Sequence, residues 1–385
     1  IFDILQNPLF YPFSGVPASE LGFLSRGAFI PSGPFFVLMF YFIYQALTME
    51  VAKTFSFIRG NLFHIRANQL YIVLGGVFYG FLFYLYFHFW VFATIFLGIL
   101  CLIFLITKNY SAARTVFFSG LVGIIISIPF WINHYFLSQL PSYVDIVVRQ
   151  GIEEGYGVRW FLWKTYILHG TLAVCAMYLG HAFFKKTLGY FLAALALTGI
   201  VAYNINIVTG FTVLSDHWGN KVFLLTNGIL LAPLLYLVWR YVAERKYFFE
   251  KIQKSFPIIG FIVAVFLTTH IVESGVKENM ASASDYTVSA EIMTAYDWLT
   301  KNTPKDSVVM TPSIETNIEL AAYTHNRIFQ ARAQNNLLSK AEVLDRAYIT
   351  HKFFDISPEM FFEIIQSRLG VFNFFTEEYN SRAID

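Results

Sequence analysis

The chain has 385 residues, of which 56% are apolar and 14% are charged, with a net charge of +2 and a mean hydropathy of +0.55. A soluble fold of this size could not bury so much apolar surface, so lipid is expected to be the solvent for most of the chain. The small net charge argues against a nucleic-acid partner. Cys101 and Cys175 lie inside apolar runs, which favours buried thiols over a disulfide or a metal site.

Eight apolar segments are long enough to cross a bilayer as helices, since one crossing takes about 20 residues. Each is expected to be helical because unpaired backbone groups are costly in hydrocarbon. The second and third segments are separated only by His88, which predicts a tight hairpin. The segments are 35–50, 69–87, 89–107, 115–134, 162–183, 188–208, 221–241 and 255–273.

Lys and Arg are distributed unevenly between the two sets of alternate loops. One set holds twelve: Lys53, Arg59, Arg66, Lys108, Arg114, Lys185, Lys186, Arg240, Arg245, Lys246, Lys251 and Lys254. The opposite loops mix basic with acidic residues, namely Arg26, Arg149, Arg159 and Lys221 with Asp145, Glu153, Glu154 and Asp216. Because basic loops stay cytoplasmic, the first set is predicted inside, and the chain after residue 273 outside.

Residues 274–385 have a higher proportion of charged residues and shorter apolar runs than residues 1–273. The sequence therefore predicts an all-α polytopic membrane domain over 1–273 and a small extracytoplasmic α/β domain over 274–385. Ser339 and Glu342 have the spacing of a capping box at a helix start. The expected helices are 287–301, 314–323, 339–354 and 357–370, and the expected strands are 307–310 and 327–331.

Two loops on the predicted outer face carry the main candidate residues. Arg26 precedes the first span and can either hold a phosphate in a bidentate fork or reach toward lipid headgroups. The second loop contains Asp216, His217, Trp218 and Lys221. His217 can contact a phosphate or exchange a proton near neutral pH, and Trp218 can stack on a sugar or anchor the membrane interface.

Other polar groups are candidates for contact with an acceptor. Arg327 begins and Arg332 follows the predicted strand 327–331, and both can bind a carbohydrate or acidic ligand, or form ordinary surface ion pairs. Glu153 and Glu154 can hold a cation or simply face solvent. His88 is interpreted as part of an aromatic, interfacial run. The histidine spacing does not indicate a metal site, and no span has a charge deep inside it, which argues against an ion pump.

Several motifs follow one another along the chain. They are Arg26 and Pro31, the hairpin Gly76, Gly80 and Tyr84–Trp90, Thr209–Gly210 with His217–Trp218, and Ala295–Val309. This order resembles the GT-C integral-membrane glycosyltransferases, in particular prokaryotic proteins similar to protein mannosyltransferases and arabinosyltransferases. The resemblance covers most of the chain.

The resemblance implies a cell-envelope enzyme that moves a sugar, with inversion, from a polyprenyl-phosphate donor in the bilayer to a glycan, lipid or protein acceptor outside. It assigns Arg26, Asp216, His217, Trp218 and Lys221 to the donor's phosphate and sugar. An acidic residue of the first outer loop would act as base or as a ligand of Mg²⁺ or Mn²⁺, and no other cofactor is implied. Asp3 and Glu20 lie in no recognisable acidic motif. We therefore expect this base, with one or more spans, upstream of Ile1.

A different class of function fits the same composition. The chain can be a transporter or flippase of lipid-linked glycans, or a non-enzymatic protein of envelope assembly. Such a protein needs a polar path through the bundle, open in turn to either side. The scarcity of charge inside the spans argues against that path, although an aromatic path for glycans needs little charge.

Overall fold

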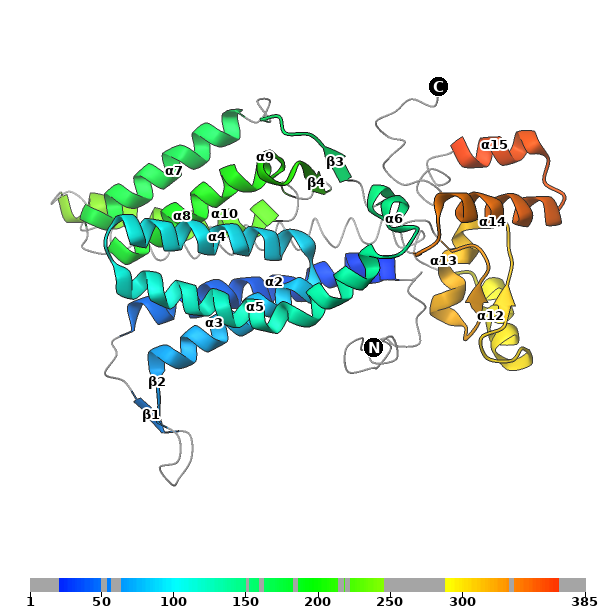
Figure 1. Ribbon diagram of the computed structural model, residues 1–385, viewed down its shortest axis with the longest axis horizontal. Helices are drawn as coiled ribbons and strands as arrows, with labels where there is room; N and C mark the ends of the chain where they lie inside the picture. The colour runs from blue at the N-terminus through cyan, green and yellow to red at the C-terminus, as the bar shows by residue number, and fades with distance from the viewer. Residues whose placement is uncertain are drawn as a thin grey trace.

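A computed structural model describes residues 21–49, 54–56, 64–149, 152–158, 163–182, 186–213, 218, 222–245, 288–331 and 336–366. Most of the described chain is a bundle of long helices (Figure 1). Its helices are α2 (Leu21–Thr48), α3 (Ala67–Leu85), α4 (Phe87–Ile106), α5 (Tyr110–Ser138), α7 (Trp163–Ala182), α8 (Lys186–Tyr203) and α10 (Phe223–Arg245), with the short α6 (Tyr143–Arg149) and α9 (Asn206–Thr209).

Four helices of the described part are long and apolar enough to cross a membrane: α3 from Asn68, α4, α5 and α8. Large apolar side chains point outward from them, as Ile124 (52% exposed), Ile125 (56%) and Ile128 (47%) do on α5. Such a surface suits lipid rather than water. The chain is therefore a helical membrane protein.

Three of the four remaining predicted spans lie in helices, and the fourth is outside the described residues. Segments 35–50, 162–183 and 221–241 lie largely within α2, α7 and α10, of which α2 and α10 contain shorter apolar stretches, Gly33–Thr48 and Leu225–Trp239. Segment 255–273 lies outside the described residues. Eight crossings therefore remain a prediction.

Two boundaries differ from the sequence prediction. The expected loop around Arg26 and Pro31 is wrong, because α2 begins at Leu21. Proline breaks a soluble helix, but it is tolerated in membrane helices because neighbouring groups satisfy the freed carbonyl. The break between α3 and α4 is at Tyr86, with φ −152° and ψ 121°, so His88 lies in the first turn of α4.

Aromatic side chains fill the interior of the bundle. Phe36 of α2 stacks on Phe89 of α4 with ring centroids 4.4 Å apart, and Phe96 of α4 meets Phe191 of α8 at 5.0 Å. All but Phe191, which is 4% exposed, are fully buried. Aromatic pairs of this kind add about 0.5–1.5 kcal/mol each beyond the area they bury. The high Phe content therefore serves packing between helices.

The short strands lie at the ends of the bundle. β1 (Thr54–Ser56) pairs with β2 (His64–Arg66), and β3 (Ile152–Glu154) pairs with β4 (Phe211–Val213), both antiparallel. Figure 1 shows α6, β3, β4 and α9 at the end nearer the C-terminal helices, and β1 and β2 at the opposite end. We call the end of the bundle that carries β3 and β4 the ribbon end.

The C-terminal segment (residues 288–366) has its own helices and strands. They are α12 (Ala290–Asn302), β5 (Val308–Val309), α13 (Ile314–Tyr323), β6 (Arg327–Ile328), α14 (Lys340–Phe353) and α15 (Pro358–Gln366). Each lies where the sequence predicts a helix or strand, and α13 has the predicted bounds. β5 and β6 are parallel, with α13 as the crossover between them. Tyr296 of α12 donates to the Glu319 carboxylate of α13 at 2.8 Å, and burial with this bond raises the pKa of Tyr296.

The predicted capping box at the start of α14 is confirmed. The Ser339 hydroxyl accepts from the Glu342 N–H at 3.2 Å, and the Glu342 carboxylate accepts from the Ser339 N–H at 3.0 Å. The backbone and hydroxyl bonds from Ser339 hold the pKa of Glu342 below its ordinary value of 4.5. The ionised carboxylate is therefore the form that stabilises this helix.

Glu342→Ala is expected to lower the unfolding temperature of the C-terminal segment at pH 7. Because the folded pKa lies below the unfolded one, this contribution is present above the unfolded pKa and is lost as pH falls through the folded pKa. Thermal unfolding of both proteins across this range tests it, with the exposed Glu363 of α15 replaced by alanine as control. An unfolding difference that stays constant with pH would contradict the assignment.

Candidate functional site

The ribbon of β3 and β4 joins two loops that the sequence analysis treated separately. Glu153 lies opposite Thr212, and Glu154 lies opposite Phe211. The backbone of the acidic pair therefore runs beside the loop that leads from Gly210 toward Trp218. These two loops form one structural unit at the ribbon end.

Asn206 of α9 fixes one end of the ribbon. Its side-chain Nδ2 donates to the carbonyl oxygens of Gly155 at 3.0 Å and Gly157 at 2.9 Å, while the Gly155 N–H donates to the Gly210 carbonyl at 2.8 Å. Gly210 has φ +79°, and a Cβ there would lie 2.7 Å from the hydroxyl of Tyr156. Glycine is thus required both for the backbone conformation and for the close approach of Tyr156.

His88 and Trp218 meet at the other end of the ribbon. The Nε2 of His88 lies 2.8 Å from the Val213 carbonyl, which can only accept, so this nitrogen carries the proton. The ring of Trp218 meets the His88 ring nearly edge-on, with centroids 4.9 Å apart. Both side chains are only 1% exposed. The hairpin of α3 and α4 therefore contributes directly to this site.

Two buried polar atoms at the ribbon end have no hydrogen-bond partner among the described residues. They are the indole Nε1 of Trp218, a donor, and the Oδ1 of Asn206, an acceptor. The two carbonyls that accept from the Asn206 Nδ2 fix the orientation of its amide. A buried polar atom without a partner costs about 1–3 kcal/mol. A ligand would have to bring an acceptor to the indole N–H and a donor to the amide oxygen.

Only some of the predicted donor-site residues lie in the part of the chain that the structure describes. Trp218 is buried at the ribbon end, whereas its neighbours Asp216, His217 and Lys221 lie outside the described residues. Arg26 lies in the second turn of α2, and its side chain is likewise outside the described part. Phe35 lies 5.9 Å from Phe81 and Phe42 lies 5.9 Å from Tyr71, so α2 packs antiparallel on α3 and its start points toward the ribbon end.

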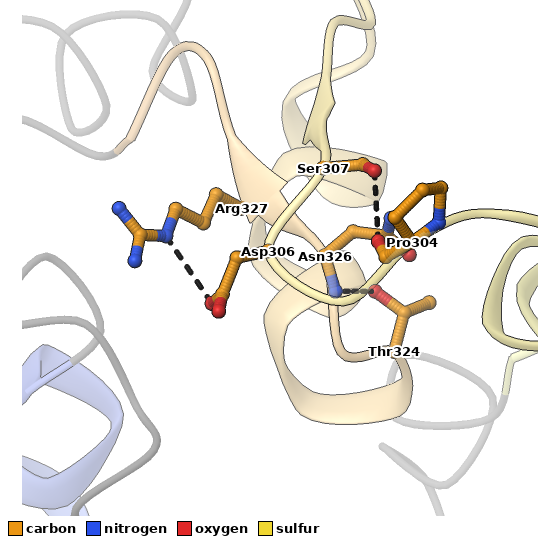
Figure 2. Close-up of polar contacts among 6 residues, drawn as sticks. All are labelled: Pro304, Asp306, Ser307, Thr324, Asn326 and Arg327. Carbon is orange, nitrogen blue, oxygen red and sulfur yellow. Dashed lines mark hydrogen bonds and ion pairs between the residues drawn. The ribbon is translucent and has the colours of Figure 1, made fainter.

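The predicted acceptor contacts are separated. The backbone of Glu153 and Glu154 lies in β3, but Arg327 lies in the C-terminal segment, and Arg332 is outside the described residues. Figure 2 shows the guanidinium of Arg327 turned toward Asp306, whose carboxylate it contacts at 3.3 Å. Both side chains are more than half exposed, so this pair adds little stability. The geometry here is that of an ordinary surface ion pair.

Sequence reasoning missed His88 and Asn206 as members of this site. His88 lies in an aromatic run, and Asn206 lies at the end of an apolar segment, so neither belongs to a motif. A polar residue beside a predicted helix end is the one signal that each carries. Their roles depend on Val213 and on Gly155 and Gly157, which are far away in sequence.

The described residues contain no group of three or more His, Cys, Asp or Glu side chains that could hold a metal ion. We therefore assign no ligands to the Mg²⁺ or Mn²⁺ that the family resemblance implies. The ribbon end is instead a site built from an indole N–H, an amide oxygen and backbone groups. Comparison of the chain with models of known protein families, with curated proteins and with solved structures finds no match.

Proposed function

We propose that the chain is a multi-pass protein of the cell membrane whose ribbon end and residues 274–385 face outward. The charge asymmetry of the loops supports this orientation. The helix directions agree with it, because Lys108, Arg114 and Lys186 lie at helix ends opposite to the α3–α4 hairpin and the β3–β4 ribbon. The ribbon end and the C-terminal segment would then share one aqueous face.

We further propose that this face transfers a sugar from a polyprenyl-phosphate donor to an acceptor hydroxyl. The observation that carries the proposal is the pair of unpartnered atoms, Trp218 Nε1 and Asn206 Oδ1, buried at the ribbon end. The indole N–H would donate to a phosphate or ring oxygen, and the amide oxygen would accept from a sugar hydroxyl. A sugar phosphate offers both groups within one molecule.

In the reaction, the acceptor oxygen forms a bond to the anomeric carbon while the bond to the phosphate oxygen breaks. Negative charge then develops on the lipid phosphate, where a donor in a water-poor site stabilises it most. Trp218 would supply one such donor, and Arg26, His217 and Lys221 are the cationic candidates that the sequence offers. The acceptor proton passes to a base that we leave unassigned.

Trp218→Phe tests this role because it keeps an aromatic ring against His88 and removes the indole N–H together with part of the bicyclic ring. Since that N–H has no partner in the described residues, its loss alone should not lower folding stability, and any fall would come from the smaller volume of phenylalanine. Transfer of labelled sugar from polyprenyl-phosphate donors to envelope acceptors in membranes should drop about tenfold, as expected for loss of one hydrogen bond to a charged group. Trp163→Phe, at an exposed indole of α7, serves as the matched control.

The same transfer assay on Arg26→Ala and His217→Ala tests the cationic candidates, with the abundance of each variant measured alongside. Unchanged sugar transfer by the Trp218→Phe variant would show that this indole does not bind the donor. If the unaltered protein transfers no sugar from any donor but moves labelled lipid between the leaflets of a proteoliposome, the transferase proposal fails and a flippase is indicated.

A further inference from the structure

Three more buried oxygens in the C-terminal segment have no partner among the described residues, namely Oδ1 of Asn317, Oδ1 of Asn326 and Oε1 of Gln330. Asn326 precedes β6, whereas Asn317 and Gln330 lie beyond the carboxyl ends of the strands. Asn317 is 9% exposed and Gln330 is 6% exposed. The Nδ2 of Asn317 donates to the carbonyls of Thr311 and Ser313, each at 3.0 Å, which fixes its amide orientation and leaves Oδ1 free to accept.

The fold brings these two side chains to the same edge of the β5–β6 pair. Thr311 follows β5, and Gln330 follows β6, whose ladder continues through the bond from the Phe329 N–H to the Val309 carbonyl at 2.9 Å. Asn317 lies near the start of α13, the crossover helix between these parallel strands. In open α/β folds, ligands bind outside the carboxyl ends of parallel strands, which is the edge where Asn317 and Gln330 lie.

The chemistry of this edge selects the ligand. Both unpartnered atoms are acceptors, so a ligand must bring hydrogen-bond donors such as hydroxyl groups. A phosphate or carboxylate brings only acceptors and would be repelled by the two oxygens. The nearby Arg346 is already engaged, because its Nη1 donates to the Phe329 carbonyl at 3.0 Å and its guanidinium lies 5.5 Å from the Phe329 ring.

The same edge leads directly to the membrane bundle. Beyond Gln330, the Leu337 carbonyl accepts from the Ser142 hydroxyl at 2.7 Å, and the Lys340 N–H donates to the Asp145 carboxylate at 2.8 Å. Ser142 immediately precedes α6, and Asp145 lies within it, between α5 and β3. A chain-like ligand held at this edge would therefore lie on the same face as the ribbon end.

We propose that the carboxyl edge of β5 and β6 binds a neutral carbohydrate chain. The hydroxyl groups of this chain would donate hydrogen bonds to Oε1 of Gln330 and Oδ1 of Asn317. The site concerns binding alone and needs no transfer chemistry. If the transferase proposal above is correct, the bound chain is the acceptor. If that proposal fails, carbohydrate binding at this edge is still expected.

The test uses the full chain in lipid nanodiscs and two probes, a neutral hexose trisaccharide and a uronic-acid trisaccharide of similar size. Ligand-observed NMR titration is expected to show binding of the neutral probe and little binding of the anionic one. Gln330→Met, which keeps the side-chain length and removes the acceptor, should raise the Kd for the neutral probe about tenfold or more. Its unfolding temperature without ligand should be unchanged or higher, because an unsatisfied buried atom has been removed.

Asn302→Leu provides a control, since this amide is exposed at the end of α12. It should leave binding of the trisaccharide unchanged. Failure of the neutral probe to bind, equal binding by Gln330→Met, or preference for the uronic-acid probe would each overturn the proposal. So would a loss of folding in Gln330→Met, which would show that the amide serves the fold rather than a ligand.

Discussion

Replacing Gly76 or Gly80 of α3 with alanine is expected to destabilise the bundle by about 1–3 kcal/mol each, as overpacking of a close contact does. A Cβ at Gly76 would lie 2.6 Å from the Ser119 carbonyl oxygen, and one at Gly80 would lie 2.9 Å from the Gly123 carbonyl oxygen. Both obstacles are backbone atoms of α5. They cannot rotate away, so the two helices would have to separate.

The spacing of these glycines explains why α3 and α5 approach so closely. Gly76 and Gly80 are four residues apart on one face of α3, and Ser119 and Gly123 have the same spacing on α5. Small residues at this spacing drive packing between membrane helices by letting the backbones meet. The Ser119 hydroxyl also donates to the Ile72 carbonyl at 3.1 Å across the contact.

Gly98→Ala is the matched control, because a Cβ at this glycine of α4 would meet no atom within 4 Å. Unfolding in detergent should show a large loss of stability for Gly76→Ala and Gly80→Ala and none for Gly98→Ala. Equal stability of all three variants would mean that α3 and α5 do not pack through this face.

The second large effect is expected where the C-terminal segment contacts the bundle. Ser142→Ala combined with Asp145→Ala removes the hydroxyl donor to Leu337 and the carboxylate acceptor of the Lys340 N–H. One of these bonds involves a charged group at the start of α14, where negative charge also complements the helix dipole. Together they should contribute about 3 kcal/mol, which corresponds to about a hundredfold change in local opening.

Hydrogen exchange of the full chain measures this directly. The backbone amide of Lys340 should exchange about a hundredfold faster in the double variant, whereas amides in the middle of α4 should keep their protection. Val144→Ala, at a 69% exposed side chain of the same short helix, is the control. Unchanged exchange at Lys340 would show that other contacts hold the C-terminal segment in place.

Local signals explain what the sequence could predict. The apolar runs that became α3, α4, α5 and α8 and the capping box at Ser339 each depend on residues within one segment. The bounds of α13 were likewise predictable, because Ser313 caps its first turn and Thr324 ends it. The start of α2 was not, since the usual effect of Pro31 on a soluble helix does not apply in lipid.

The candidate site depends on contacts that no local pattern reveals. The bonds from His88 to Val213 and from Ser142 to Leu337 join residues 125 and 195 positions apart. β3 and β4 are only three residues long, too short for a recognisable alternation of side chains. Of the two side chains with unpartnered atoms at the ribbon end, Trp218 was identified from sequence, because an indole in a polar loop between spans is conspicuous. Its buried and unpartnered N–H became visible only in the folded chain.

The most direct test of the account is a cryo-EM structure of the chain in a lipid nanodisc with a non-hydrolysable polyprenyl-phosphonate sugar. Headgroup density is expected at the ribbon end, with an oxygen within hydrogen-bond distance of Trp218 Nε1 and a hydroxyl donating to Asn206 Oδ1. A headgroup bound at the opposite end of the bundle, or a ribbon end that stays empty while the ligand occupies another site, would contradict it.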